Sequence, residues 1–186
     1  MSAAATSPRA KPRARRVARQ SPLPCYGVAD GVHSLRHDLT ASECRAVDRA
    51  LSILGQRLRE PGAYLDDVRV LKPYLRLRIG GDPCERFSVL YLDAKCRALA
   101  YECHFTGTLT QTSVYPRAIV EAALKHRAAS VVLAHNHPSG SVTPSRADEA
   151  LTQTLKAALA LVDVSVLDHI IVSGDETLSM AQKGFI

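Results

Sequence analysis

The chain has 186 residues, of which 46% are hydrophobic, and this length suffices to bury the core of one domain of ordinary size. Its five cysteines are odd in number and include no C-x-x-C pair, which indicates a reducing compartment and argues against a cysteine zinc site. No apolar run approaches the roughly 20 residues of a membrane-spanning helix and no signal peptide is visible, so we expect a soluble, cytoplasmic protein without a membrane partner.

The formal net charge of +6 is confined to the N-terminus. Of the 24 basic residues, six lie in residues 1–23, which contain no acidic residue, and the remaining 18 balance the 18 acidic residues of the chain. Because this segment is rich in Ala, Ser, Pro and Arg, we expect a disordered basic arm. Three interpretations of the arm remain open: a solvated tail, an arm that binds nucleic acid without sequence preference, and an organelle transit peptide.

Residues 24–80 are expected to form a helical N-terminal region. Thr40 and Glu43 have the spacing of a capping box at the start of a helix. The apolar stripe of this helix consists of Val47, Leu51, Leu54 and Leu58. A second helix is expected at residues 66–79, interrupted by Pro73. We interpret the first helix as a packing or dimerisation element, which makes a homo-oligomer one expected assembly.

A hairpin of two strands is expected next, at residues 85–92 and about 96–105, joined by a turn at residues 93–95. The near-continuous apolar end of the first strand suits a sheet that is covered on both faces. Pro116 then opens a helix, and a last strand is expected at residues 164–172. This alternation of helices and strands predicts an α/β fold with a mixed sheet and helices on both of its faces.

The central motif of the chain is HNHPSG, residues 135–140, which directly follows an apolar, β-branched run at residues 130–134. That run predicts a short buried strand that ends at the first histidine. Residues two apart on a strand project from the same face, so His135 and His137 are expected to point together. Thr143-Pro144 then predicts the start of a helix, with the threonine as its N-cap and the proline at its first position.

Ser145 and Asp148 are three residues apart and share a face of that helix. Counting back by turns from the apolar positions of the helix places Asp148 at its buried edge, where an unpaired carboxylate is unfavourable. Zn²⁺ binds imidazole and carboxylate ligands in a tetrahedron, and catalytic sites keep the fourth position open. We therefore predict that His135, His137 and Asp148 bind zinc. The alternative is that Ser145 and Asp148 form only a capping box and that the histidines are polar loop residues.

The pattern H-x-H followed by S-x-x-D resembles the JAMM (MPN+) metallopeptidase motif. The longer runs HNHPSG, TPSRAD and LDHIIV resemble the RadC family of bacterial proteins (UPF0758), and most closely its shorter members from prophages and mobile elements. The similarity extends from about residue 60 to the C-terminus. It implies a cytidine-deaminase-like α/β/α sandwich, preceded by N-terminal helices, with residues 81–186 as the MPN metal-binding domain. A bacterial origin also disfavours the transit peptide.

Hydrolysis at such a site needs a general base that takes a proton from the metal-activated water. The sequence offers Glu85, Glu102, Glu121 and Glu149 and does not choose among them. The resemblance implies Glu85, because JAMM proteins place this glutamate on the strand that opens the domain; the alternative is a solvated strand end. The resemblance also implies that Ser145 helps to stabilise an oxyanion, whereas the alternative is an ordinary serine of the first helical turn.

Asp168 and His169 lie within an apolar strand, so one of them points inward. That residue either orients a ligand imidazole or is a core polar residue whose hydrogen bonds are satisfied within the protein.

Two functional hypotheses follow. The first is a zinc-dependent hydrolase of JAMM type that cleaves a peptide or isopeptide bond in a peptide or protein substrate. The second is a DNA-repair or mobile-element accessory protein that uses the JAMM fold as a scaffold for binding nucleic acid or protein. The complete set of five site residues favours the enzyme, and only the basic arm favours DNA. The motifs of zinc deaminases and of H-E-x-x-H proteases are absent from the sequence.

Overall fold

A computed structural model describes residues 39–57, 68–107 and 114–186 of the protein. The basic arm predicted at residues 1–23 lies outside these ranges, as does the predicted helical region from residue 24 to residue 38. Among the described residues, no helix is both long enough and apolar enough to cross a membrane.

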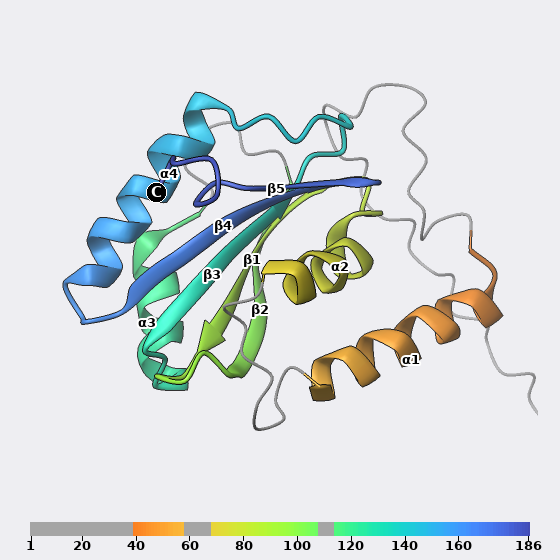
Figure 1. The fold of residues 1–186 in the computed structure, drawn as a ribbon, viewed down its shortest axis with the longest axis horizontal. Coiled ribbons are helices and arrows are strands. Elements are labelled where there is room, and N and C mark those ends of the chain that lie inside the picture. Colours follow the sequence, from red (N-terminus) through yellow and green to blue (C-terminus); the bar gives the residue numbers. More distant parts are fainter. Residues whose placement is uncertain (1–38, 58–67, 108–113) are drawn as a thin grey trace, which may run out of the picture.

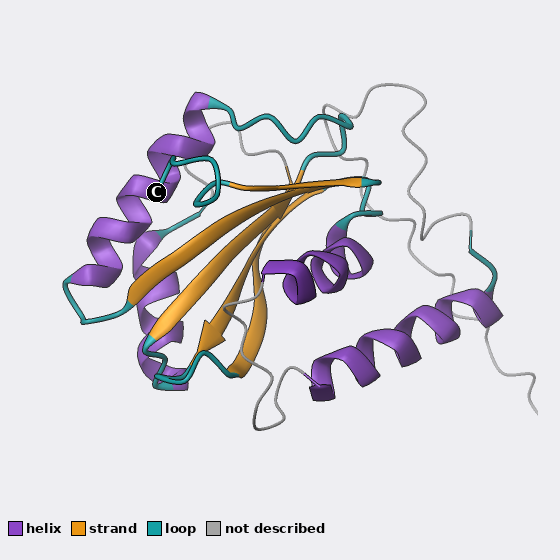
Figure 2. Ribbon diagram, in the orientation of Figure 1, coloured by secondary structure: helices purple, strands orange, loops and turns teal. Residues whose placement is uncertain are grey.

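Helices and strands alternate along most of the described chain (Figure 1 and Figure 2). The helices are α1 (Ala41–Arg57), α2 (Val68–Ile79), α3 (Pro116–His126) and α4 (Arg146–Ala160). The strands are β1 (Glu85–Leu92), β2 (Ala98–Gly107), β3 (Ser130–Asn136), β4 (Ser165–Ser173) and β5 (Glu176–Ser179).

The strands form one mixed sheet in the order β2-β1-β3-β4-β5. β1 pairs antiparallel with both β2 and β3, β3 and β4 are parallel, and β4 pairs antiparallel with β5. In the pairing of β1 with β3, Phe87 lies opposite His135. The sequence did not predict β5, and β2 begins and ends two residues later than expected.

Helices cover both faces of the sheet, as Figure 1 shows. Along β1, Phe87 and Val89 belong to the apolar core under α3 and α4, whereas Leu90 and Leu92 belong to the core under α2. Successive residues of a strand point to opposite faces, so the continuous apolar sequence of β1 serves two cores at once. The predicted α/β/α arrangement with a mixed sheet is therefore confirmed.

The second helix runs without interruption through Pro73, contrary to expectation. Its buried side chains are Leu71, Tyr74, Leu75 and Ile79, which pack against the sheet. This packing outweighs the loss of one helical hydrogen bond at the proline, because tertiary contacts supply most of a helix's stability. Thus α2, which the sequence analysis grouped with the N-terminal region, forms a covering layer of the sheet.

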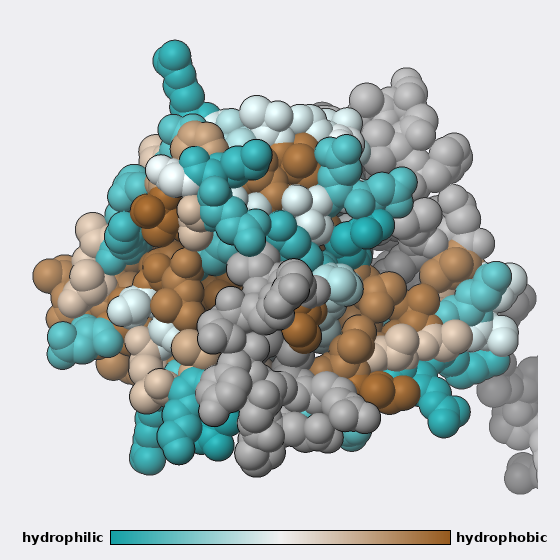
Figure 3. All heavy atoms as spheres, in the orientation of Figure 1, coloured by the Kyte–Doolittle hydropathy of each residue, from teal (hydrophilic) through white to brown (hydrophobic). Residues whose placement is uncertain are grey.

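The first helix lies outside this layer and packs on α2 (Figure 1). It begins with the predicted capping box, in which Glu43 accepts hydrogen bonds from the Thr40 backbone and hydroxyl. Leu51 is buried against α2, but Ile53 remains 50% exposed, and Figure 3 shows hydrophobic side chains along this helix.

Among the described residues, Cys44, Cys96 and Cys103 are free thiols.

Candidate metal centre

Three side chains with metal-binding groups converge where β3 ends and α4 begins. His135 is fully buried near the end of β3, His137 follows the strand, and Asp148 lies buried in the first turn of α4. His135 Nε2 is 3.2 Å from Asp148 Oδ1, His137 Nε2 is 3.5 Å from Asp148 Oδ2, and the two Nε2 atoms are 2.8 Å apart. The residues that the zinc prediction named are therefore close together in space.

The hydrogen bond at the far side of the His137 ring fixes its tautomer. His137 Nδ1 lies 2.8 Å from the carbonyl oxygen of Ser141, which can only accept, so Nδ1 carries a proton and donates it. This leaves Nε2 as the ring atom that faces Asp148. Burial alone would lower the pKa of His137, but hydrogen bonds to Asp148 and to Ser141, and the charges of Asp148 and Glu85, raise it above its ordinary value.

A chain of buried hydrogen bonds fixes the tautomer of His135 in the same way. The hydroxyl of Thr152 donates to the backbone carbonyl of Asp148 over 2.6 Å, so it must accept from Nδ1 of His169, also at 2.6 Å. Burial holds the pKa of His169 well below its usual value, so this ring is neutral and its Nε2 is an acceptor. Nε2 of His169 therefore accepts from Nδ1 of His135 over 2.8 Å.

When both rings are neutral, these tautomers place lone pairs on both Nε2 atoms of the cluster. Two imidazole lone pairs and a carboxylate within 3.5 Å of one another repel, and this repulsion is removed either by a metal ion between them or by a proton on a ring nitrogen, which is why Asp148 raises the pKa of His137. In a tetrahedral zinc site with bonds of about 2.0–2.1 Å, ligand atoms lie roughly 3.3–3.4 Å apart. The two separations between imidazole and carboxylate atoms, 3.2 and 3.5 Å, are close to this value, whereas the two Nε2 atoms, 2.8 Å apart, would separate slightly on binding an ion. The described residues thus offer a three-ligand site for a divalent metal ion, and this donor set accepts zinc and other first-row metals.

Asp148 uses its two carboxylate oxygens differently. Oδ2 accepts hydrogen bonds from the Ser145 backbone at 2.8 Å and from the Ser145 hydroxyl at 2.7 Å, while the Asp148 backbone donates to the same hydroxyl. This is the capping box considered from sequence, but it leaves Oδ1 facing His135, so the two interpretations are compatible. Burial opposes ionisation of Asp148, yet hydrogen bonds from both histidines and Ser145 hold its pKa well below the ordinary value.

The start of α4 was predicted two residues too early. The N-cap is Ser145 and not Thr143, and Pro144 precedes the helix. The reciprocal hydrogen bonds between Ser145 and Asp148 satisfy two backbone donors of the first turn, which the threonine does not do here.

Glu85, the predicted general base, begins β1 beside this cluster. Since Phe87 pairs with His135 in antiparallel register, the position two residues earlier in β1 faces His137 on the same side of the sheet. The effect of its charge on the pKa of His137 reflects this proximity. Glu102, the next candidate, instead forms a 2.6 Å hydrogen bond with His126 on α3, and its register partner is Val89, further along β1.

Asn136, between the two histidines, points to the opposite face and fixes the segment before β1. Its side-chain oxygen accepts from the backbone of Arg86 at 2.7 Å, and its amide donates to the carbonyls of Asp82 and Cys84 at 3.2 and 3.1 Å. Glu85 lies inside this anchored segment. Asn136 therefore couples the position of Glu85 to that of the two histidines.

The Asp168-His169 pair divides between the two faces of β4. His169 reaches His135, which is the orienting contact considered from sequence. Asp168 accepts from the His169 backbone, the Ser179 hydroxyl and the Ala181 backbone, so it is a satisfied core residue. Thr152 was not predicted to contribute, although its position one turn after Asp148 places both residues on the same face of α4.

Comparison with known proteins identifies relatives of this chain. Residues 65–185 match the family model described as a RadC-like JAB domain. A UPF0758 protein of Variovorax paradoxus is 55% identical over 150 residues, which cover 80% of this chain and 66% of the relative. A UPF0758 protein of Acidovorax sp. is 53% identical over 86% of this chain and 71% of its own length, and one of Verminephrobacter eiseniae is 59% identical over 75% and 59%. The aligned part of the chain thus spans about two thirds of the length of these relatives.

Proposed function

Because this chain belongs to the family with a RadC-like JAB domain, we propose that it is a zinc-dependent hydrolase that cleaves a peptide or isopeptide bond. The observation that carries the proposal is the convergence of two imidazole groups and one carboxylate, from His135, His137 and Asp148, next to a second acidic residue, Glu85. Such a cluster favours a bound cation, and three protein ligands leave one tetrahedral position for a reactant.

The roles of the protein groups follow from their positions. A divalent ion in this site supplies Lewis acidity, which makes water a nucleophile near neutral pH and polarises a carbonyl group. His135, His137 and Asp148 would hold the ion, and Glu85 would take the proton from the attacking water and return it to the leaving amine. The exposed hydroxyl of Ser145 would turn from Asp148 toward the carbonyl oxygen of the substrate and donate a hydrogen bond there.

The decisive experiment is Glu85→Gln, assayed with a peptide library on protein of known metal content. Glutamine preserves the shape of the side chain but cannot accept a proton, so we expect an unchanged metal content and a rate lower by a factor on the order of 10²–10⁴. Glu102→Gln is the matched control, because this residue is committed to His126, and it should leave the rate unchanged.

Three results would count against this assignment. Loss of zinc from Glu85→Gln would make the carboxylate a ligand and not the base. A variant that cleaves as fast as the wild type would place the base elsewhere. Absence of hydrolysis in the wild type across the library would favour the binding-scaffold function.

The second function, an accessory protein that contacts nucleic acid, rests on the six basic residues among residues 1–23. Each Lys or Arg that neutralises a phosphate releases counterions, so binding through this arm should weaken steeply with salt. Deletion of residues 1–23 should abolish most of the salt dependence of binding to an arbitrary DNA duplex. Binding that survives the deletion unchanged would place the contact in the remaining chain.

A further inference from the structure

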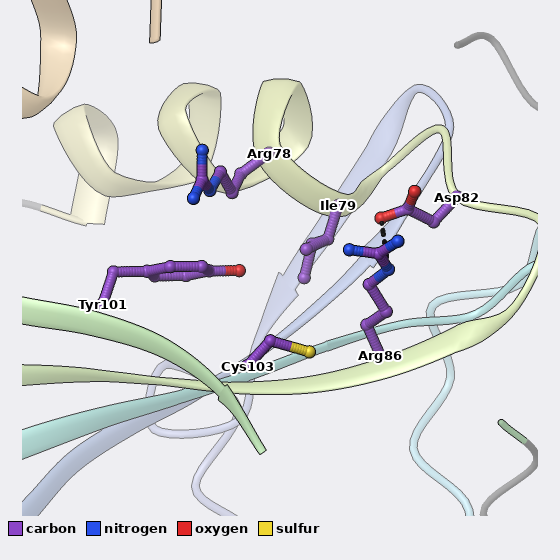
Figure 4. A pocket seen from close by; sticks show the side chains of 6 residues that line it. All are labelled: Arg78, Ile79, Asp82, Arg86, Tyr101 and Cys103. Carbon is purple, nitrogen blue, oxygen red and sulfur yellow. Dashed lines mark ion pairs between the residues drawn. The ribbon is translucent and has the colours of Figure 1, made fainter. Parts of the chain in front are cut away.

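A polar cavity of about 360 Å³ lies on the α2 face of the sheet, opposite to the metal centre. It opens between the end of α2 and the strands β1 and β2 (Figure 4). Its lining residues are Arg78, Ile79, Asp82, Arg86, Tyr101 and Cys103. This volume is at the lower end of the roughly 300–1,000 Å³ typical of small-molecule sites.

The hydroxyl of Tyr101 points into this cavity, as Figure 4 shows. This buried hydroxyl and the fully buried Ser88 hydroxyl on the neighbouring strand lie near each other, but neither has a well-aligned hydrogen-bond partner among the described residues. Burial raises the pKa of Tyr101 to about 12, with a partial offset from the nearby Ser88 hydroxyl, so the phenol is a protonated donor at neutral pH. A buried donor without a partner is unfavourable, and an acceptor inside the cavity would remove this penalty.

The charge of the cavity wall is positive. The guanidinium of Arg78 lies 5.0 Å from the centre of the Tyr101 ring and forms no ion pair within the described part of the chain. Arg86 is 3.0 Å from Asp82, but these two atoms do not align as a hydrogen bond. Two guanidinium groups against one carboxylate leave a net charge of +1, so the wall suits an anionic ligand.

We propose that this cavity binds an oxyanion, the carboxylate or phosphate group of a small molecule. Arg78 and Tyr101 donate to its oxygens from the α2 side, and the unused N–H groups of Arg86 donate from the strand side. Guanidinium groups match the planar geometry of such oxygens, and hydrogen bonds to a charged partner are stronger than those between neutral groups. A cationic or purely apolar ligand would leave these donors unpaired.

The proposal can be tested by NMR titration of the full chain with phenyl phosphate and with benzoate, followed through the side-chain Nε–H signals of arginine. Benzylamine is the cationic control probe. Because phosphate also binds metal ions, the titration uses protein dialysed free of metal and is repeated after addition of zinc. We expect saturable shifts of the Arg78 and Arg86 signals with the anions only, and the more tightly bound anion identifies which chemical group the cavity selects.

Three variants locate the binding. Arg78→Gln should weaken the affinity for the better anion on the order of tenfold or more, and Tyr101→Phe should weaken it by a smaller factor, because it removes one neutral donor. Arg76→Gln is the matched control: Arg76 lies on the same helix, is exposed, and contacts Gly174 and Asp175 outside the cavity. The affinity of the Arg76→Gln variant for the anion should equal that of the wild type.

Several outcomes would overturn the proposal. The first is that neither anion gives saturable shifts in the wild type at concentrations of tens of millimolar. The second is that Arg76→Gln weakens the anion affinity as much as Arg78→Gln does. The third is that both Arg78→Gln and Tyr101→Phe bind the anion as tightly as the wild type. Binding seen only after zinc is added would assign the anion to the metal centre instead. Since the readout is binding to metal-free protein, it is independent of whether the protein hydrolyses peptides.

Discussion

The two faces of the sheet differ in how completely their buried polar side chains are paired. On the α4 face, the polar atoms of His135, His169 and Thr152 are paired in a continuous buried chain. On the α2 face, Asn136 and Asp168 are fully hydrogen-bonded, but the hydroxyls of Ser88 and Tyr101 lack well-aligned partners among the described residues. Complete hydrogen bonding holds side chains in fixed orientations, as a metal site needs, whereas an incompletely paired hydroxyl can still accept a further partner.

The largest effect that we predict concerns the ligands themselves. Wild-type protein purified without chelator should contain close to one zinc ion per chain, and His135→Ala or His137→Ala should reduce this to near zero. Asp148→Asn should weaken binding without abolishing it, because the amide oxygen remains a poorer ligand. Elemental analysis measures the zinc content per chain of the wild type and the three variants. Metal content near zero in the wild type, or unchanged in both histidine variants, would refute the site.

The hydrogen-bond chain behind His135 should have the next largest effect. Thr152→Val removes the acceptor that fixes His169, so the zinc dissociation constant should rise about 10-fold to 100-fold while the site persists. Thr154→Val is the matched control, since Thr154 lies on the same helix and bonds only to the Ala150 carbonyl at the surface. A competition titration against a chromogenic chelator measures the difference. Equal zinc affinities in the two variants would show that the chain does not position His135.

One buried tyrosine on each face allows the contribution of its hydroxyl to the free energy of unfolding to be compared. The Tyr91 hydroxyl, on the α3 and α4 side, forms a 2.7 Å hydrogen bond with His104, whereas the Tyr101 hydroxyl has no well-aligned partner among the described residues. Tyr91→Phe should therefore lower the free energy of unfolding by about 0.5–1.5 kcal/mol, and Tyr101→Phe should leave it unchanged or slightly raised. Urea denaturation without added anion measures both. If Tyr101→Phe destabilised the protein more than Tyr91→Phe, the difference in hydrogen bonding between the two hydroxyls would have no energetic consequence.

The smallest effect is expected at Glu102. Its hydrogen bond with His126 lowers its pKa, and a carboxylate with a lowered folded pKa stabilises the protein above its unfolded pKa of roughly 4.3. Glu102→Gln should thus cost at most about 1 kcal/mol at pH 7, because the pair is partly exposed. This difference should disappear as the pH falls below 4 through the lowered folded value. Thermal melts at a series of pH values from 7 downward test it, and a difference that does not change with pH would exclude the ionic origin.

The predictable part of the site consists of short-range patterns. Alternation along a strand placed His135 beside His137, and helical spacing placed Asp148 at a buried edge, because both depend on fewer than five neighbouring residues. The position of Glu85 depends on the register between β1 and β3, fifty residues apart, and came only from the family resemblance. The contact between Thr152 and His169 depends on how α4 packs on β4, which no local pattern encodes.

The fold shows the same limit. Apolar runs and turns predicted the four longer strands and the helices on both faces. The N-cap was predicted at Thr143, although the reciprocal hydrogen bonds need an acceptor three residues later, which Ser145 has in Asp148 and Thr143 lacks because that residue is Arg146. The cavity under α2 combines residues of one helix and two strands. Such a site becomes visible only after the elements are assembled.

Asn136 has a consequence for insertions and deletions. Its three hydrogen bonds to the segment at residues 82–86 form in a single alignment of β1 against β3. A slip by one residue would turn Arg86 toward the metal face in place of Glu85, and so would exchange a proton acceptor for a permanent cation. The segment between α2 and β1, although it is a loop, should therefore tolerate substitutions far better than changes of length.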